Sequence, residues 1–401
     1  MPQTLKRRLG AADKPSGMNL DALLAAAVAA GASDVHLKLG RPPLIRRDGA
    51  IGPLEGAAEL TAEDLDACLH KLTATAPERY EVFQRTGDLD IAYTGPDLPR
   101  FRVNAFRQRG STSFALRVIP RKVPRFSDLG LPPGVERLAE EHRGLVLVTG
   151  ATGSGKSTTL AAIVDHVNRS RASHIVTIED PLEFLHEDQK SIVNQREVGL
   201  DTESFGQALR RALRQDPDTI LIGELRDAET AQTALQAAES GHLVFSTLHT
   251  IDAAETISRL VEFFPEGKQQ QIRSILSGVL RGVISQRLLP RVDGGRVAVI
   301  EVMVNNARIA DLIREGRPDE VGDAIAEGEY FDMQTFQQAL IAKVIEGAID
   351  ADTAADASSN KHDFLVALER ALKVQALDEP PAEQQSEPEA PVAGLRVAQI
   401  R

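Results

Sequence analysis

The sequence has 401 residues, of which 42% are hydrophobic and 26% are charged, proportions that are ordinary for a folded protein of about two to three domains. Lysine and arginine number 46 against 58 acidic residues, and the net charge of −12 argues against a dedicated nucleic-acid-binding protein. The single cysteine, Cys68, excludes an internal disulfide and a multi-cysteine zinc site, and no apolar run approaches the ~18 residues of a transmembrane helix.

The start of the chain superficially resembles a secretory signal peptide. Basic residues at 6–8 precede an alanine-rich apolar stretch at 23–30, but Asp13 and Asp21 interrupt the approach to it. An amphipathic helix that leads into a strand explains the pattern better. We therefore interpret residues 1–17 as a flexible extension and Met18 as a candidate start of the protein.

Residues 18–120 alternate between short helical and strand patterns. A helix is predicted over 19–30, and a second one begins at the capping-box-like Thr61–Asp64 segment and runs toward Leu72. Strands are predicted over 34–39, 43–47, 88–93, 101–106 and 113–118, with a hairpin signal at Asp48-Gly49. The first folded region is therefore predicted to be a small α+β domain with an antiparallel sheet.

The texture changes after a proline-rich stretch, which we interpret as an interdomain linker over 121–143. From 144 to 372 continuous apolar strands alternate with helices, and this alternation predicts a parallel sheet of βαβ units. Strands are predicted at 145–148, 175–178, 219–222, 243–245 and as a pair near 296–304, and helices at 158–168, 228–240, 269–289 and 333–345. Residues 373–401 are rich in proline and glutamate, which predicts a disordered tail.

The clearest motif follows the strand at 145–148. The segment Gly150-Ala151-Thr152-Gly153-Ser154-Gly155-Lys156-Ser157 fits the G-x-x-x-x-G-K-[ST] phosphate-binding loop without deviation, and a helix begins at Thr158. Glycines let the backbone N–H groups face the phosphates, and the helix N-terminus favours an anion. Lys156 is expected to reach the β- and γ-phosphates of ATP, and the Ser157 hydroxyl to bind Mg²⁺. A chance glycine-rich turn would lack this strand-loop-helix context.

Two acidic clusters are expected at the same sheet edge, because the carboxyl ends of parallel strands meet there. Glu179-Asp180-Pro181-Leu182-Glu183 follows the strand at 175–178, and Gly223-Glu224-Leu225-Arg226-Asp227 follows the strand at 219–222. The second cluster resembles a Walker B strand end, but Gly223 stands where many such enzymes have a metal-binding aspartate. Glu224 is therefore expected to contact the bound metal ion through a water molecule. The alternative is that both clusters are solvated loop residues.

With these motifs the chain resembles the secretion-superfamily ATPases. The loop at 150–157, an "Asp box" at 177–184, the Walker B segment at 223–227 and a "His box" at 241–250 each match that superfamily. Within it, segments 31–37, 100–106 and 311–315 resemble the type IV pilus retraction branch, over about residues 18–372. Extension and type II secretion relatives carry a four-cysteine zinc module. The lone cysteine therefore favours retraction and predicts no zinc.

The resemblance implies an α/β protein with a PAS-like α+β N-terminal domain and a RecA-like P-loop ATPase domain with a helical C-terminal part. It implies that Glu183 is the general base, that Glu224 is the Walker B glutamate, and that Arg102 and Arg117 reach the phosphates on domain closure. Arginine suits that role because its planar fork contacts two phosphate oxygens and keeps its charge. Exposed strand arginines without a ligand are the alternative.

The His-box histidines, His242 and His249, are implied to sense or couple the nucleotide state. They could equally be satisfied interior histidines, and their spacing is not a zinc signature. Cys68 lies on a helical pattern with Leu65 and Leu72, which is typical of a small core residue.

The motifs together with this resemblance imply a hexameric, Mg²⁺-dependent ATPase at the cytoplasmic face of the inner membrane. It would power pilus retraction through a membrane platform protein, with or without a second retraction ATPase, and would bind no nucleic acid. The alternatives are an accessory retraction ATPase, a related secretion or pilus-assembly ATPase, a nucleotide-binding scaffold that does not turn over, and, more weakly, a DNA translocase.

Overall fold

The computed structural model describes residues 18–47, 49–74, 76–120 and 122–378, and it confirms a mixed α/β protein built on two sheets. The predicted extension at 1–17, the Asp48 position of the hairpin signal and the predicted tail beyond 378 lie outside the described residues.

The N-terminal sheet has six strands in the order β3-β2-β1-β6-β5-β4, and each pair is antiparallel, as the alternating patterns predict. Its strands are β1 Asp34–Leu37, β2 Leu44–Arg47, β3 Ala50–Pro53, β4 Asp88–Thr94, β5 Arg100–Gln108 and β6 Ser111–Val118. Its helices are α1 Leu20–Ala29, α2 Ala62–Thr73 and α3 Pro77–Thr86.

Local signals set the ends of these helices. The Thr61 side chain accepts a hydrogen bond from the Asp64 amide while Asp64 accepts one from the Thr61 amide, so the predicted capping box is present. The Asn19 side chain caps α1. Phe83, Phe101 and Phe114 are fully buried in the core of this part of the chain. Cys68 is 2% exposed in the same core, as its helical spacing predicts.

The predicted linker contains two short helices, α4 Phe126–Leu129 and α5 Pro133–Ala139. Pro133 is the first residue of α5, a position where a missing N–H costs nothing because that N–H has no intrahelical acceptor. Val135 and Leu138 are buried against the helix that follows the phosphate loop. The stretch therefore packs onto the second sheet instead of serving only as a connector.

The second sheet has seven strands in the order β13-β12-β7-β11-β10-β8-β9. Its strands are β7 Gly144–Thr149, β8 His174–Glu179, β9 Ile192–Glu197, β10 Thr219–Ile222, β11 Leu243–Leu248, β12 Leu280–Pro290 and β13 Arg296–Val304. The ladder from β12 through β9 is parallel throughout, as the βαβ pattern predicts. The carboxyl ends of these strands therefore share one edge.

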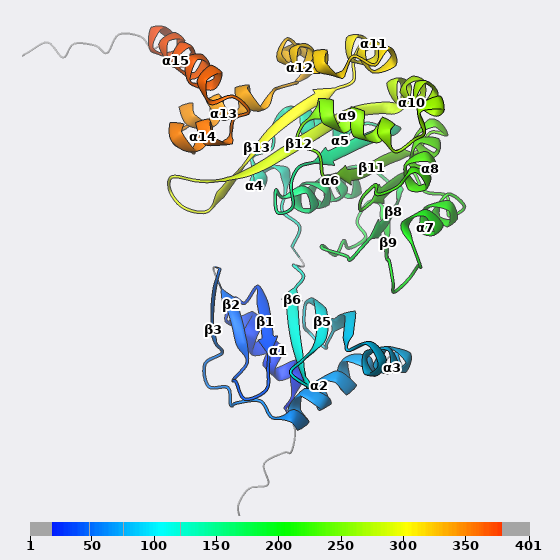
Figure 1. Cartoon of the computed structure of the whole chain (residues 1–401), viewed down its shortest axis with the longest axis vertical. Helices are drawn as coiled ribbons and strands as arrows, with labels where there is room; N and C mark the ends of the chain where they lie inside the picture. Colours follow the sequence, from blue (N-terminus) through cyan, green and yellow to red (C-terminus); the bar gives the residue numbers. More distant parts are fainter. Residues whose placement is uncertain (1–17, 48, 75, 121, 379–401) are drawn as a thin grey trace, which may run out of the picture. The chain divides into compact units, whose positions relative to one another are not determined.

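Helices cover both faces of this sheet (Figure 1). Alternate residues of β7 enter two separate clusters: Leu145 and Leu147 join one core, and Val146 and Val148 join the other. This two-sided burial explains the continuous apolar run. The covering helices are α6 Lys156–Ser170, α7 Phe205–Ala212, α8 Ala228–Glu239, α9 Ala253–Glu262, α10 Glu266–Val279, α11 Ala307–Glu315 and α12 Val321–Ala326.

The single long helix predicted over 269–289 is wrong. Helix α10 ends at Val279, and Leu280–Pro290 is strand β12, which pairs in parallel with β7. An apolar run fits a buried strand and a buried helix equally well, and here pairing with the central sheet decides the outcome. The β-branched Val283 and Ile284 suit that strand, where both are fully buried.

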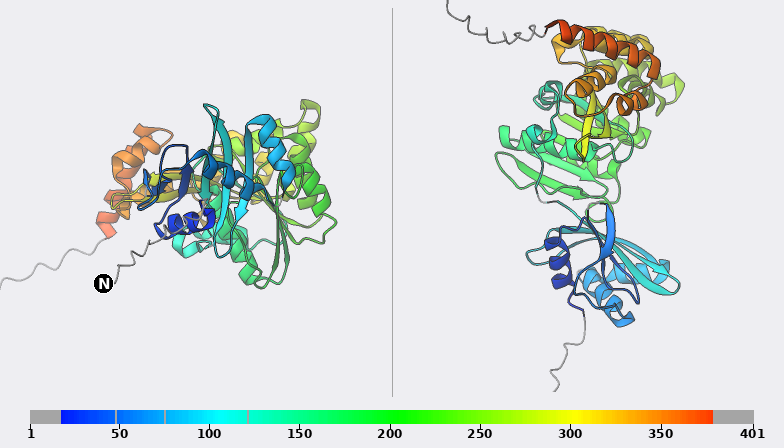
Figure 2. Two further views of the ribbon diagram at one scale, coloured as in Figure 1. Left: turned by 90° about the horizontal axis from the view of Figure 1, so that it is seen from below. Right: turned by 90° about the vertical axis from the view of Figure 1, so that its left-hand side faces the viewer.

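Residues 289–296 and 336–378 form a compact unit of their own. Its helices α13 Phe336–Ile345, α14 Ala351–Ala357 and α15 Lys361–Asp378 pack together in one group, drawn in orange to red in Figure 2. Helix α15 runs to Asp378, so residues 373–378 of the predicted disordered tail are helical. In the part of the chain that the structure describes, no helix combines the length and the apolar character needed to span a bilayer.

Candidate functional site

The phosphate loop lies where its motif predicts, between the end of β7 and the start of α6. Gly150 has φ 139°, and a Cβ atom there would lie 2.3 Å from the Gln286 carbonyl oxygen, so only glycine fits. The first-turn N–H groups of α6 have no acceptor within the helix. The buried Ser154 hydroxyl has no hydrogen-bond partner among the described residues. The loop therefore offers unused donors of the kind that hold phosphate oxygens.

Lys156 is the first residue of α6 and is 9% exposed. Its Nζ donates to the carbonyl oxygens of Gly150, at 2.7 Å, and Ala151, at 3.0 Å. Loss of hydration lowers the pKa of the Lys156 ammonium, while the negative charges of Glu224 and Glu183 oppose that shift. The two carboxylates are therefore within electrostatic reach of the loop lysine, as the shared sheet edge predicts.

A pocket of about 300 Å³ opens beside the loop. Its walls are the first five loop residues, Ile251 after β11, and Gln286, Arg287 and Leu288 of β12. The buried Gln286 Oε1 accepts a hydrogen bond from Thr159 of α6 at 2.9 Å, which fixes β12 against the loop. The sequence reasoning missed the β12 residues because it placed them on a helix, and a polar Gln-Arg pair inside an apolar strand was the available signal.

Glu224 follows β10 at the same edge, and its side chain is 16% exposed. It forms an ion pair with Arg226 and lies 3.3 Å from His249 Nε2. Arg226 also lies 3.7 Å from Asp180. The Walker B and Asp-box clusters therefore meet, and His249 joins them.

The two histidines lie at opposite ends of strand β11. His249 follows β11, whereas His242 precedes it. The His242 Nδ1 lies 3.0 Å from the Ala237 carbonyl oxygen and 3.0 Å from the Ser240 hydroxyl. The structure brings His249 to the acidic cluster and leaves His242 at the end of α8.

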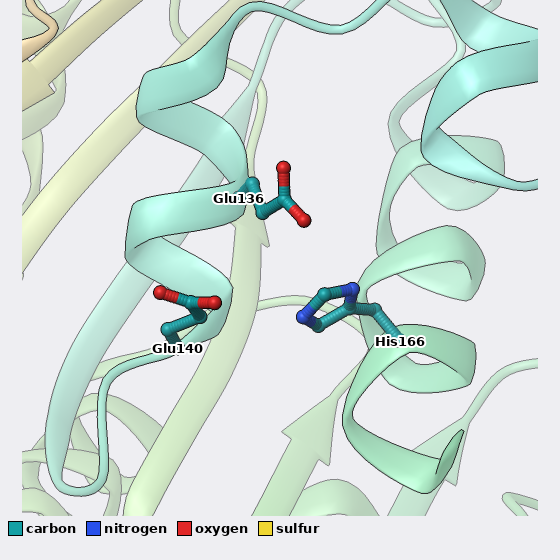
Figure 3. A group of neighbouring side chains, drawn as sticks. All are labelled: Glu136, Glu140 and His166. Carbon is teal, nitrogen blue, oxygen red and sulfur yellow. The ribbon is translucent and has the colours of Figure 1, made fainter. Parts of the chain in front are cut away.

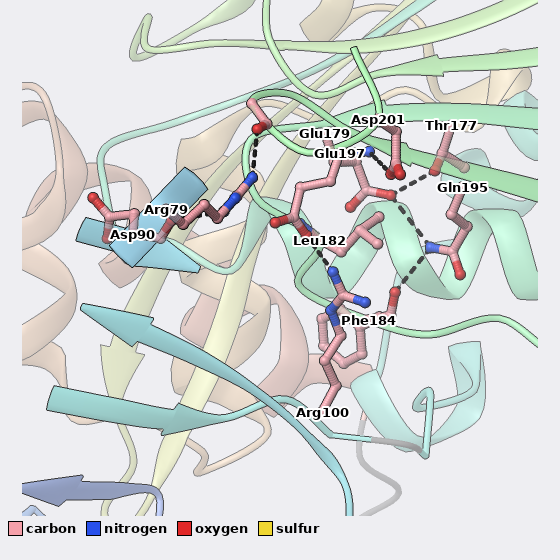
Figure 4. Close-up of polar contacts among 11 residues, drawn as sticks. Arg79, Asp90, Arg100, Thr177, Glu179, Leu182, Phe184, Gln195, Glu197 and Asp201 are labelled. Carbon is pink, nitrogen blue, oxygen red and sulfur yellow. Dashed lines mark hydrogen bonds and ion pairs between the residues drawn. The ribbon is translucent and has the colours of Figure 1, made fainter. Parts of the chain in front are cut away.

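The loop after β8 carries Glu183, whose side chain is exposed, and the Asp180–Pro181 peptide bond in it is cis. At its start, Glu179 accepts a hydrogen bond from the Thr177 hydroxyl at 2.7 Å and a longer one from Gln195 at 3.4 Å (Figure 4). Loss of hydration raises the pKa of the Glu179 carboxyl to about 7, because burial penalises its charged form more than these bonds favour it.

Arg102 and Arg117 stand directly opposite each other on β5 and β6. Arg117 donates to Asp34 at 2.8 Å, and its side chain remains 66% exposed. In the part of the chain that the structure describes, neither arginine forms a hydrogen bond or an ion pair with the phosphate loop. Arg100, two positions earlier on the same strand, forms an ion pair with Glu197 that sequence reasoning did not foresee.

A group of possible metal ligands lies on α5 and α6 (Figure 3). Glu136, Glu140 and His166 bring one ligand atom each to within 4.8 Å of the others, and the two glutamates are exposed. The His166 ring stacks on Phe126 with centroids 4.9 Å apart. Exposed acidic groups commonly gather without an ion, and we assign no metal to this group.

Comparison with known proteins agrees with this arrangement. The family described as Type II/IV secretion system protein matches residues 87–294. The type IV pilus retraction ATPase PilT of Pseudomonas aeruginosa is 44% identical over 348 residues, which cover 86% of this chain and all of that relative.

The chain belongs to the type II/IV secretion system protein family.

Two further relatives of this family extend the comparison. A twitching motility protein of Neisseria gonorrhoeae is 42% identical over 319 residues, which cover 79% of this chain and 84% of the relative. A crystal structure of the pilus retraction motor PilT with bound ADP superposes with a TM-score of 0.80 at 44% identity, over 86% of this chain and 98% of that one. The α/β fold class and the resemblance to retraction ATPases are thereby confirmed.

Proposed function

We propose that this chain is an ATP-hydrolysing motor that powers retraction of type IV pili. The observation that carries the proposal is that the phosphate loop after β7 and the acidic clusters after β8 and β10 lie at the carboxyl ends of one parallel ladder, where Arg226 joins Glu224 to Asp180. The similarity to PilT over most of the chain supports the retraction output, and the solved structure of that relative with bound ADP supports the nucleotide.

The loop from Gly150 to Thr158 would cradle the phosphates of ATP, with Lys156 on the β- and γ-phosphates. Mg²⁺ prefers oxygen ligands and keeps several waters, and the residues present fit that demand. The Ser157 hydroxyl stands in the first turn of α6, and the half-buried Glu224 carboxylate would act through water. Bound there, the ion would neutralise charge on the β- and γ-phosphate oxygens.

Glu183 would orient and deprotonate the water that attacks the γ-phosphate. Its side chain is exposed and therefore open to solvent water. Lys156 would stabilise the charge that develops on the transferred group. Arg102 and Arg117 would add positive charge when the N-terminal part of the chain closes on the nucleotide. His249 lies beside Glu224 and would couple the nucleotide state to strand β11, which His249 follows. His242 is a weaker candidate for coupling, because its hydrogen-bond partners lie at the end of α8.

Six copies would assemble into a ring, and closure around ATP passed from one subunit to the next would drive a membrane platform protein. We place the ring at the cytoplasmic face of the inner membrane, where ATP is available. A second retraction ATPase would be a further partner. We expect no zinc and no nucleic acid among its ligands.

Twitching motility tests this proposal. A strain of the source organism that lacks the gene should stop twitching and accumulate surface pili. The wild-type gene and the Glu187→Gln variant, which changes an exposed acid in the same loop, should restore motility, whereas Glu183→Gln and Lys156→Ala should not. Normal motility and normal piliation in the deletion strain would contradict the retraction output and favour an accessory or secretion role.

A further inference from the structure

Strand β9 carries polar side chains that face the loop bearing Glu183. β9 pairs in parallel with β8, and the register sets Gln195 beside Thr177 and Glu197 beside Glu179. Residues two apart on a strand share a face, so Gln195 and Glu197 point to the same side. Figure 4 shows both side chains directed at the segment that leaves β8.

Gln195 holds the loop on the carboxyl-terminal side of Glu183. Its Nε2 donates to the Phe184 carbonyl oxygen at 2.9 Å, and its Oε1 accepts from the His186 amide at 2.8 Å. One side-chain amide therefore satisfies a main-chain acceptor and a main-chain donor of the loop, as a neighbouring strand would. The same Nε2 also reaches Glu179 at 3.4 Å.

Glu197 holds the loop on the other side of Glu183. Its Oε2 accepts a hydrogen bond from the Leu182 amide at 3.3 Å. Leu182 is 5% exposed and Glu197 is 7% exposed, so this contact lies in the interior. Residues 182, 184 and 186 are thus all tied to β9, while Glu183 between them keeps its side chain exposed.

The same Glu197 oxygen binds an arginine of the N-terminal sheet. Arg100 Nη2 on β5 donates to Glu197 Oε2 at 2.8 Å, and only 18% of the Arg100 side chain is exposed. A second arginine, Arg79 on α3, donates to the Gly199 carbonyl oxygen at 2.7 Å, just after β9. Removing one partner of an enclosed ion pair leaves the other charge uncompensated, so Glu197 is expected to respond to the loss of Arg100.

We propose that Gln195 and Glu197 are positioning residues for Glu183, and that Arg100 governs the position of Glu183 through Glu197. The inference rests on the proposed ATP hydrolysis. Because the contacts of this network lie on β9 and the Glu183 loop and not on the phosphate loop, it acts on turnover and not on nucleotide affinity. A change at Arg100 in the N-terminal sheet is thereby passed to the hydrolytic carboxylate.

The test measures ATP turnover and hydrogen exchange on the full-length assembled protein. Displacement of a catalytic group by about 1 Å costs up to ~100-fold in rate, so Arg100→Ala, Glu197→Gln and Gln195→Ala are each expected to lower kcat about tenfold or more. The KM for ATP should stay within about threefold. The Leu182 amide should exchange faster in the first two variants, and the His186 amide in the third.

Two further variants separate positioning from mere stability. Arg100→Ala combined with Glu197→Gln should lose no more activity than the worse single variant, because Arg100 acts on the loop through Glu197. Arg137→Ala, which removes the Arg137–Asp332 ion pair of 3.1 Å, is the matched control and should change neither kcat nor exchange in the Glu183 loop. The isosteric Glu197→Gln keeps the test valid if the alanine variants fail to fold.

Unchanged kcat in Gln195→Ala and Glu197→Gln would overturn the inference. A rise in the KM for ATP as large as the fall in kcat would overturn it as well. A wild-type protein that releases no phosphate would instead overturn the proposed function. The exchange measurement would then still decide whether Arg100 and β9 hold this loop, and unaltered exchange at Leu182 and His186 would refute that hold.

Discussion

The Glu179 carboxyl at the end of β8 makes the stability of the ATPase part of the chain depend on pH. Loss of hydration raises its pKa from 4.5 to about 7. The folded protein therefore holds the Glu179 proton more tightly than the unfolded chain does, and folding loses stability as the pH rises from about 4.5 to about 7. A difference of about 2.5 pKa units at ~1.4 kcal/mol per unit amounts to about 3.5 kcal/mol.

Glu179→Gln removes this titration and keeps an oxygen that can accept the Thr177 hydrogen bond. The stability of the variant minus that of the wild type should rise by most of this amount, about 2.5 kcal/mol, between pH 5 and pH 8. Urea unfolding followed by far-ultraviolet circular dichroism measures it, since the chain has no tryptophan. Glu187→Gln, which changes an exposed acid of the same loop, is the control variant. A flat difference for Glu179→Gln would refute the assignment of the raised pKa to this carboxyl.

Three other predictions concern single residues. Gly150→Ala should lower the melting temperature of the nucleotide-free protein well below that of Gly153→Ala. Both variants incur the cost of about 1–2 kcal/mol for an alanine in a left-handed backbone conformation, but only at Gly150 would the new Cβ atom meet Gln286. Equal losses in melting temperature would contradict this close approach. Burial raises the pKa of the Cys68 thiol to about 12, so a thiol reagent at pH 8 should label it only after unfolding. Loss of hydration lowers the pKa of His186 to about 4, so the native state loses stability as the pH falls from about 6.5 to about 4, and His186→Gln should abolish that loss in acid titrations.

The phosphate loop could be predicted from the sequence because its signal is local. The motif is eight consecutive residues, and the strand before it and the helix after it set the geometry of the loop. Phosphate binding by this loop stays a prediction of the motif. The acidic clusters at Glu183 and Glu224 could be predicted for a related reason: each directly follows a continuous apolar strand, and parallel strands end at one edge.

Strand β9 could not be predicted in the same way. It is an edge strand whose residues after Val193 are polar, and two of those side chains, Gln195 and Glu197, bind the Glu183 loop instead of filling a core. The Arg100–Glu197 pair joins residues 97 positions apart, and no local pattern distinguishes Arg100 from Arg102 on the same strand. Residues 280–289, predicted to be helical, form strand β12 because they pair with the distant strand β7. This strand supplies Gln286 to the pocket wall.

The most direct test of the account is phosphate release by the purified, assembled protein supplied with ATP and Mg²⁺. Wild type and Glu187→Gln should release phosphate steadily. Lys156→Ala and Glu183→Gln should each fall by at least ~100-fold, since each removes a group that acts on the transferring phosphoryl or its attacking water. Steady phosphate release by Glu183→Gln at the wild-type rate, or none by the wild type, would contradict an ATP-driven motor with this site.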